Sequence, residues 1–303
     1  MKSNYRYIVK AFMAMAVIAG TTSCDDFLDR EPMSSISPET YYSTAAQLEA
    51  NLNDEYPNVL PSFGQWTYGI FGEDKGTDNQ IEVNPNDRYT QDRWKVPHSE
   101  SDNWKFERIY RINFFLSEAL PKFGEDMIGS QNTISGSVAT IKHYIGEMYF
   151  LRAYEYFKKL QLFGDFPIIN QPLADEMEAL REASKRFPRN EVARFIISDL
   201  DKAYAYMSDV DMATTRINKD AAMLVKSRVA LFEATWLQNF KGTAFVPGGE
   251  GWPGASLHNN YQYPSGNIDN EVKYFLEQAV EASKLVADKY KGSLTENTGV
   301  LQQ

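Results

Sequence analysis

Apolar residues recur at helical spacing in six segments along the chain. The first is expected to begin at Ser37-Pro38, a pair typical of a helix start, and to end before Pro57. The others are expected at about 102–121, 137–163, 190–207, 218–236 and 269–290. Alternation of the kind that strands show is nearly absent. The pattern therefore predicts a predominantly helical fold.

Capping residues mark the ends of several of these predicted helices. Ser37, Asn190 and Asn218 stand where an N-cap is expected, and Gly164 follows a long apolar stripe as a helix stop. In the last segment the predicted buried face consists of Val272, Leu276, Ala279, Val280, Ser283, Val286 and Tyr290. Small residues such as Gly146 in the predicted faces let helices approach closely, so we expect TPR-like helical pairs.

Two long segments lack any regular period. Residues 58–101 and 242–267 are rich in glycine, proline and aromatic residues. Long segments without regular structure are uncommon in compact domains and are often functional. We therefore expect TPR-like helical pairs joined by long irregular loops.

The N-terminus has the three parts of a secretory signal peptide. Cations at Lys2, Arg6 and Lys10 precede an apolar run over 11–20, which is too short to span a bilayer. Small residues then lead to Cys24, the only cysteine. We predict a signal peptide over 1–23, a tether over 24–36 and a helical domain over 37–303.

The position of Cys24 resembles that of the lipidated cysteine in bacterial lipoproteins. Thr21 and Ser23 stand where those proteins usually have Leu and a small Ala or Gly, so the match is loose. Several acyl chains would anchor the protein durably. An incidental cysteine in a linker is the alternative.

Composition restricts the partners. The net charge is −10, which argues against binding nucleic acid by charge. Aromatic residues make up 14% of the chain. They serve either an aromatic core or a binding surface, and composition leaves both open.

Signals for catalysis or metal binding are scarce. The three histidines lie far apart, and the sequence has no His-Glu-x-x-His, Cys-x-x-Cys or Gly-x-Ser-x-Gly motif. We therefore predict no metal site, no cofactor and no enzymatic activity. Paired carboxylates of the kind that hydrolyse glycosides remain an open alternative, since a chain with 41 acidic residues supplies such pairs by chance.

The segment GEMYFLRAYEYFKKLQLFGDFPII (146–169) closely resembles the signature of the SusD/RagB family. Glu147 and Arg152 within it are expected to be architectural and to support one another in a helix bundle. Further resemblance follows in the family's order at 24–29, 107–119, 187–207, 216–236 and 279–294. Family members continue well beyond the equivalent of Gln303, so we expect this chain to lack their C-terminal region.

The resemblance implies a SusD-like α-solenoid that binds oligosaccharides without catalysis. Such proteins are lipid-anchored on the outer membrane of Bacteroidetes, face the cell exterior and pass ligand to a SusC-like TonB-dependent transporter. A glycan-processing enzyme and a TPR-like scaffold without a sugar site are the alternatives. The glycan-binding candidates are Asp78, Asn79, Arg88, Trp94, Trp66 and Tyr68 in the first irregular segment, and Trp252, Tyr261 and Tyr263 in the second.

Overall fold

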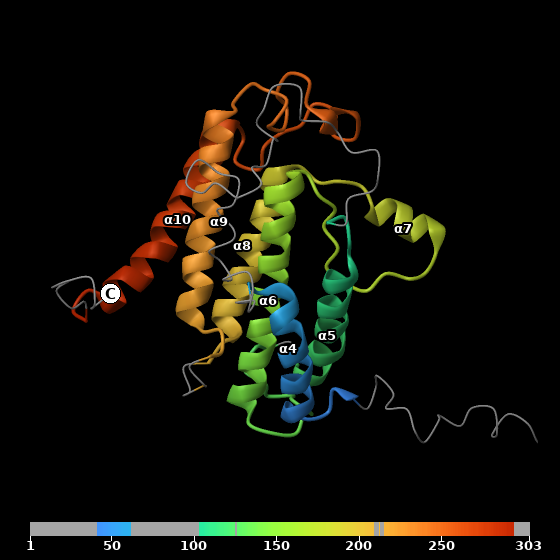
Figure 1. Ribbon diagram of the computed structural model, residues 1–303, viewed down its shortest axis with the longest axis vertical. Coiled ribbons are helices and arrows are strands. Elements are labelled where there is room, and N and C mark those ends of the chain that lie inside the picture. Colours follow the sequence, from blue (N-terminus) through green and yellow to red (C-terminus); the bar gives the residue numbers. More distant parts are fainter. Residues whose placement is uncertain (1–40, 62–102, 125, 209–211, 213–214, 294–303) are drawn as a thin grey trace, which may run out of the picture. The chain divides into compact units, whose positions relative to one another are not determined.

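The computed structural model describes residues 41–61, 103–124, 126–208, 212 and 215–293 (Figure 1). The chain divides into two compact units, residues 1–41 and 42–303. The predicted signal peptide, the tether with Cys24 and the helix start at Ser37 all lie outside the described residues. The fold below is that of the second unit.

Within the described ranges, the second unit contains seven α-helices, one short 3-10 helix and no strand. This confirms the predicted helical fold class. The elements are α4 (Ala45–Val59), α5 (Glu107–Phe123), α6 (Val138–Phe163), α7 (Met177–Ala183), α8 (Arg189–Tyr206), α9 (Lys219–Asn239), η3 (Pro253–Ser256) and α10 (Ile268–Tyr290).

Helix α6 lies at the centre of the packing. It contacts α4, α5 and α8, while α8 also packs on α9 and α9 packs on α10. Figure 1 shows α6, α8, α9 and α10 running in alternate directions, so consecutive helices form antiparallel pairs. Gly146 allows the approach of α6 to α8, because a Cβ there would lie 2.8 Å from the Met207 nitrogen and 3.0 Å from the Ala203 carbonyl oxygen.

Several predicted helix ends are confirmed. The Ser137 side chain accepts a hydrogen bond from the Thr140 N–H, and Gly164 terminates α6. The Asn218 side chain caps α9 through the Ala221 N–H at 2.9 Å. These local hydrogen bonds satisfy backbone donors that the first helical turn leaves unpaired.

The predicted cap at Asn190 is wrong. Helix α8 begins at Arg189 after Pro188, and Asn190 is buried inside its first turn. Its side-chain NH2 donates to the Tyr261 hydroxyl and to a Glu271 carboxylate oxygen. The Asn190 side chain therefore bonds to residues that are distant in the sequence and does not cap α8.

The first helix also differs from the prediction. Residues 42–44 are not helical, and Thr44 forms a capping box with Gln47 at the start of α4. Pro57 lies inside the last turn, and the helix continues to Val59. Proline removes one N–H donor there, so only a hydrogen bond of the last turn is lost.

Three other boundaries or faces were not predicted correctly. Helix α5 begins at Glu107, five residues later than expected, and α7 had no predicted counterpart. On α10, Ala279 and Val286 are buried as predicted, but Leu276, Val280 and Tyr290 are exposed, because the stripe that packs against α9 is rotated from the predicted one. That stripe consists of Glu271, Phe275, Ala279, Ala282 and Val286.

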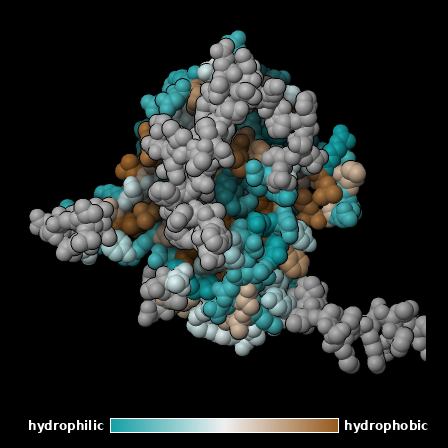
Figure 2. All heavy atoms as spheres, viewed as in Figure 1, coloured by the Kyte–Doolittle hydropathy of each residue, from teal (hydrophilic) through white to brown (hydrophobic). Residues whose placement is uncertain are grey.

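Exposed apolar residues gather on α7. Met177 is 82% exposed and Leu180 is 38% exposed, and no residue of this helix is buried. Figure 2 shows hydrophobic surface where α7 lies and mostly hydrophilic surface over α4 and α5. No helix in the described part of the chain combines the length and apolar character of a membrane span.

Buried charges join the helices. The Arg152 side chain donates to both Asp199 carboxylate oxygens at 2.6 and 2.8 Å and to the Asn113 side chain at 2.9 Å. The Glu147 carboxylate accepts bonds from Arg216 and from the Tyr56 hydroxyl. Glu147 and Arg152 therefore have a structural role. Each pairs with residues on other segments, and they do not pair with each other.

We predict that Asp199→Asn lowers the free energy of unfolding by about 3 to 5 kcal/mol, because it leaves the buried Arg152 charge without a counter-ion. Urea unfolding measures the loss. Asp269→Asn is the matched control, since its pair with Lys241 is exposed on both sides, and it should cost less than about 1 kcal/mol. Equal effects of the two substitutions would contradict the role given to Asp199.

Candidate functional site

A pocket of about 480 Å³ lies where the end of α6 meets the segment between α9 and α10. Aromatic rings and two arginines line it together with one carboxylate. The lining residues are Leu160, Gln161, Leu162, Phe163, Gly164, Asp165, Arg186, Arg189, Trp236, Ala244, Phe245, Trp252, Pro253, Gly254 and Leu257.

Asp165 holds the base of this pocket together. The left-handed backbone of Gly164, with φ of +68°, ends α6 and turns the chain into Asp165. One Asp165 oxygen accepts the Arg189 backbone N–H at 2.9 Å, and the other accepts the Trp252 indole N–H at 2.7 Å. Burial raises the pKa of Asp165, although these two bonds oppose the rise.

Arg189 forms the second fixed part of the base. Its guanidinium donates to both carboxylate oxygens of the buried Glu233 at 2.9–3.2 Å. The same guanidinium lies 4.0 Å from the centre of the Trp236 ring. The Trp236 ring is therefore held in a fixed position at the pocket by a cation–π contact and a buried ion pair.

Three of the predicted glycan-binding residues, Trp252, Tyr261 and Tyr263, pack together next to the pocket. The Trp252 and Tyr261 ring centres are 5.6 Å apart, and those of Tyr261 and Tyr263 are 5.2 Å apart. Trp252 lines the pocket but is only 5% exposed, and its ring stacks on His258.

The two tyrosine side chains are held in place by hydrogen bonds of their hydroxyl groups. The Tyr261 hydroxyl bonds with the Asn190 side chain, and the Tyr263 hydroxyl donates to the Pro247 carbonyl at 2.6 Å. Neither tyrosine lines the pocket. Burial raises the pKa of both hydroxyls, so both remain protonated donors at neutral pH.

The other six candidates, Trp66, Tyr68, Asp78, Asn79, Arg88 and Trp94, lie outside the described residues. Sequence reasoning missed Asp165, Arg186 and Phe245. A signal for Asp165 was present, because the predicted stop at Gly164 leaves the next side chain at the end of a long helix. No comparable signal separates Phe245 from the other aromatic residues of its segment.

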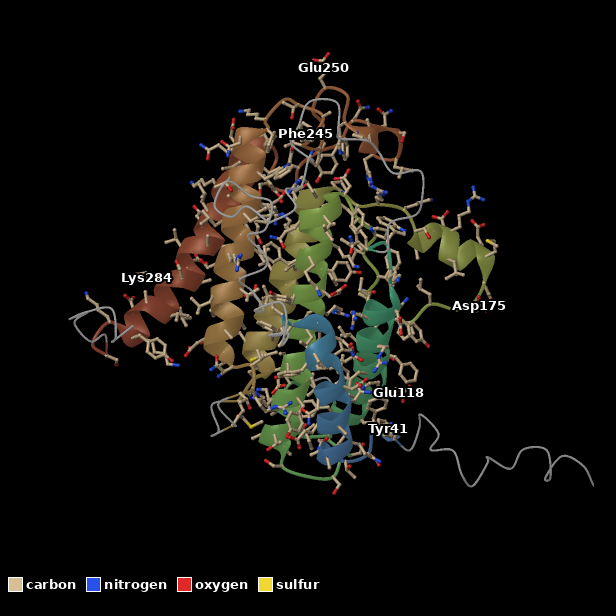
Figure 3. The ribbon with its side chains drawn as sticks, in the orientation of Figure 1. Tyr41, Glu118, Asp175, Phe245, Glu250 and Lys284 are labelled. Atoms are coloured by element: carbon tan, nitrogen blue, oxygen red, sulfur yellow. The ribbon has the colours of Figure 1, made fainter. Side chains whose placement is uncertain are left out.

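The rim of the pocket offers groups that can contact a ligand. Phe245 is 61% exposed, and Figure 3 shows it on the segment that follows α9, with Glu250 pointing outward from the tip. Arg186 is exposed and lies 4.6 Å from the centre of the Trp104 ring. Gln161 adds an exposed amide from α6. Apolar rings beside a few polar groups are typical of small-molecule sites.

Among the described residues, no three His, Cys, Asp or Glu side chains lie close enough together to bind a metal ion.

Residues 26–231 match the protein family SusD-like, described as "Starch-binding associating with outer membrane". The chain belongs to the SusD-like family. This confirms the family that the motif at 146–169 indicated.

Two SusD-like relatives come from Formosa agariphila. SusD-like protein P25 is 26% identical over 233 residues, which are 71% of this chain and 41% of the relative. SusD-like protein P2 is 25% identical over 253 residues, which are 80% of this chain and 46% of the relative. The chain thus spans less than half the length of either SusD-like relative.

A solved SusD-like protein from Bacteroides fragilis has the same fold over the shared part. It is 21% identical, with a TM-score of 0.50, and the match covers 70% of this chain and 40% of that protein. The SusD-like assignment therefore agrees in sequence and in fold.

We predict that Asp165→Asn costs more stability at about pH 4 than at about pH 7. Because the folded-state pKa is raised, this carboxyl stabilises the fold below its unfolded pKa and loses that contribution as pH rises through the folded value. Urea unfolding of both proteins at the two pH values measures the difference, in which the other carboxyls cancel. A difference that does not change with pH would contradict the prediction.

Proposed function

We propose that this chain binds an oligosaccharide in the pocket at the end of α6. The observation that carries the proposal is the exposed Phe245 ring beside the Arg186 and Gln161 side chains, over a base fixed by buried bonds. Sugar faces pack on aromatic rings, and their hydroxyl groups bond to polar side chains. The description of the matching family as starch-binding supports this class of ligand.

Binding without hydrolysis is the activity that the chemistry favours. Asp165 is the only carboxylate among the described residues that line the pocket, and each of its oxygens already accepts a hydrogen bond. Glycoside hydrolysis usually uses two carboxylates, one on each side of the scissile bond. We therefore propose a binding protein and keep a glycan-processing enzyme as the rival.

We further propose that the protein is lipid-anchored at Cys24 on the outer membrane, facing the cell exterior, and delivers its ligand to a SusC-like TonB-dependent transporter. The signal-like segment over 1–23 and the cysteine that follows it support the anchor. The family description as associating with the outer membrane supports the location.

We predict that Phe245→Ala weakens oligosaccharide binding about tenfold, because it removes the exposed ring on which a sugar face can pack. Isothermal titration with malto-, xylo- and galacto-oligosaccharides measures the change. Tyr110→Ala is the control, since it removes a ring that is 51% exposed on α5 and does not line this pocket.

Three outcomes would reject this assignment. Release of shorter sugars from labelled oligosaccharides by the pure protein would favour the enzyme. Capture of a transporter by a protein that binds none of the sugars would favour the TPR-like scaffold. If Phe245→Ala left binding unchanged, the sugar would have to bind at another part of the chain.

We predict that Cys24→Ala releases the protein from membranes, because the thiol that would carry the acyl chains is lost. Fractionation of cells that express either form, followed by immunoblotting, measures the distribution. Ser23→Ala keeps the thiol and serves as the control. A Cys24→Ala protein that stays in the membrane fraction would reject the anchor.

A further inference from the structure

A second pocket, of about 410 Å³, lies between the end of α4, the start of α5 and the outer side of α6. Four of its lining side chains are cations and two are carboxylates. They are Lys105, Arg108, Lys158 and Lys159 against Glu107 and Glu155. An excess of positive charge in one pocket stands out in a chain with a net charge of −10.

Two of the cations are held in place by the same buried carboxylate. Lys158 lies 2.6 Å and Lys159 lies 3.2 Å from oxygens of Glu155, whose side chain is 5% exposed. Lys158 also donates to the Val59 carbonyl, and Lys159 donates to the Asn103 carbonyl. One negative charge is thus shared by two fixed ammonium groups, so positive charge remains in excess.

Arg108 supplies an unused donor group. It is half-buried in the first turn of α5. In the part of the chain that the structure describes, no hydrogen bond or ion pair engages its guanidinium, and its charge acts on the Glu55 carboxyl only through space. Glu107 beside it opposes an anion but does not cancel the excess.

The start of α5 reinforces the attraction for an anion. Its N-cap, Phe106, makes no side-chain capping bond, so the first-turn N–H groups receive no acceptor from it. The helix dipole at such an end favours negative charge, of which Glu107 in the first turn already supplies one.

The second pocket adjoins the first. Leu162, which is 56% exposed on the last turn of α6, lines both. The aromatic pocket and the cationic pocket therefore lie on either side of one exposed side chain. A ligand in the first pocket can reach the second by passing over Leu162.

We infer that the cationic pocket binds the carboxylate or sulfate group of an acidic oligosaccharide whose sugar rings occupy the aromatic pocket. The inference rests on the proposed function and names its substrate class. A planar guanidinium can pair with either anion through two parallel N–H···O bonds. A neutral sugar offers no anion to the Arg108 guanidinium.

The test compares acidic oligosaccharides with neutral counterparts of the same length and linkage. Oligogalacturonides are paired with their carboxyl-reduced forms, and sulfated galactans with their desulfated forms. Isothermal titration of the full chain at low salt should show that at least one acidic ligand binds about tenfold more tightly than its neutral partner.

Arg108→Gln should abolish this preference while retaining the affinity for the neutral form. Arg228→Gln is the matched control, because Arg228 is exposed on α9 and lines neither pocket. This control should preserve the preference. Inorganic sulfate that competes with the acidic ligand, but not with its neutral partner, would support the same site.

The outcomes separate this inference from the proposed function. Equal binding of acidic and neutral forms, or a preference that survives Arg108→Gln, would overturn the inference and leave oligosaccharide binding intact. Failure of every sugar to bind would reject both. Binding of inorganic sulfate alone would assign the pocket to a free anion and overturn the acidic-glycan inference.

Discussion

Most buried charges in the described core pair with a residue on another segment, and the packing of the helices depends on these pairs. An unpaired buried ion costs several kcal/mol, so helices that carry such groups are stable only when their partners meet. Arg152 on α6 requires Asp199 on α8, Arg189 on α8 requires Glu233 on α9, and Arg194 on α8 binds Glu271 on α10. Apolar stripes bring the helices together, while these pairs select their register.

The same requirement supports the candidate site. Arg189 forms a buried ion pair with Glu233 and also contacts the Trp236 ring. The floor of the pocket is therefore part of the rigid helical core. Asp165 then ties the irregular segment to this base through Trp252. The fixed base and the exposed rim have different tasks. The base keeps the pocket open in one shape, and Phe245 and Arg186 remain available at its edge. Such preorganisation reduces the entropy lost on binding.

Sequence pattern predicted those features that depend on near neighbours. The cap at Asn218 and the stop at Gly164 are local, and the apolar pattern of α6 is long enough to be unambiguous. The partner of Arg152 lies 47 residues away, and the partner of Asn190 lies 81 residues away. No period reveals such pairs. On α10, both the buried and the exposed apolar residues recur at helical spacing, and contact with α9 decides which of them are buried. The pocket combines residues from four separate segments, so its membership follows from packing and not from spacing.

The bonds of Tyr56 have a consequence for the order in which the protein can fold. Its hydroxyl accepts the Ile217 backbone N–H and donates to Glu147, which Arg216 also binds. Helix α4 is made early on the ribosome, yet these contacts reach across 161 residues. The bonds between Tyr56 and the segment just before α9 can therefore form only after that segment has been synthesised. The contacts of α4 with α6 can form earlier, but this set of bonds is complete only after residue 217 has emerged.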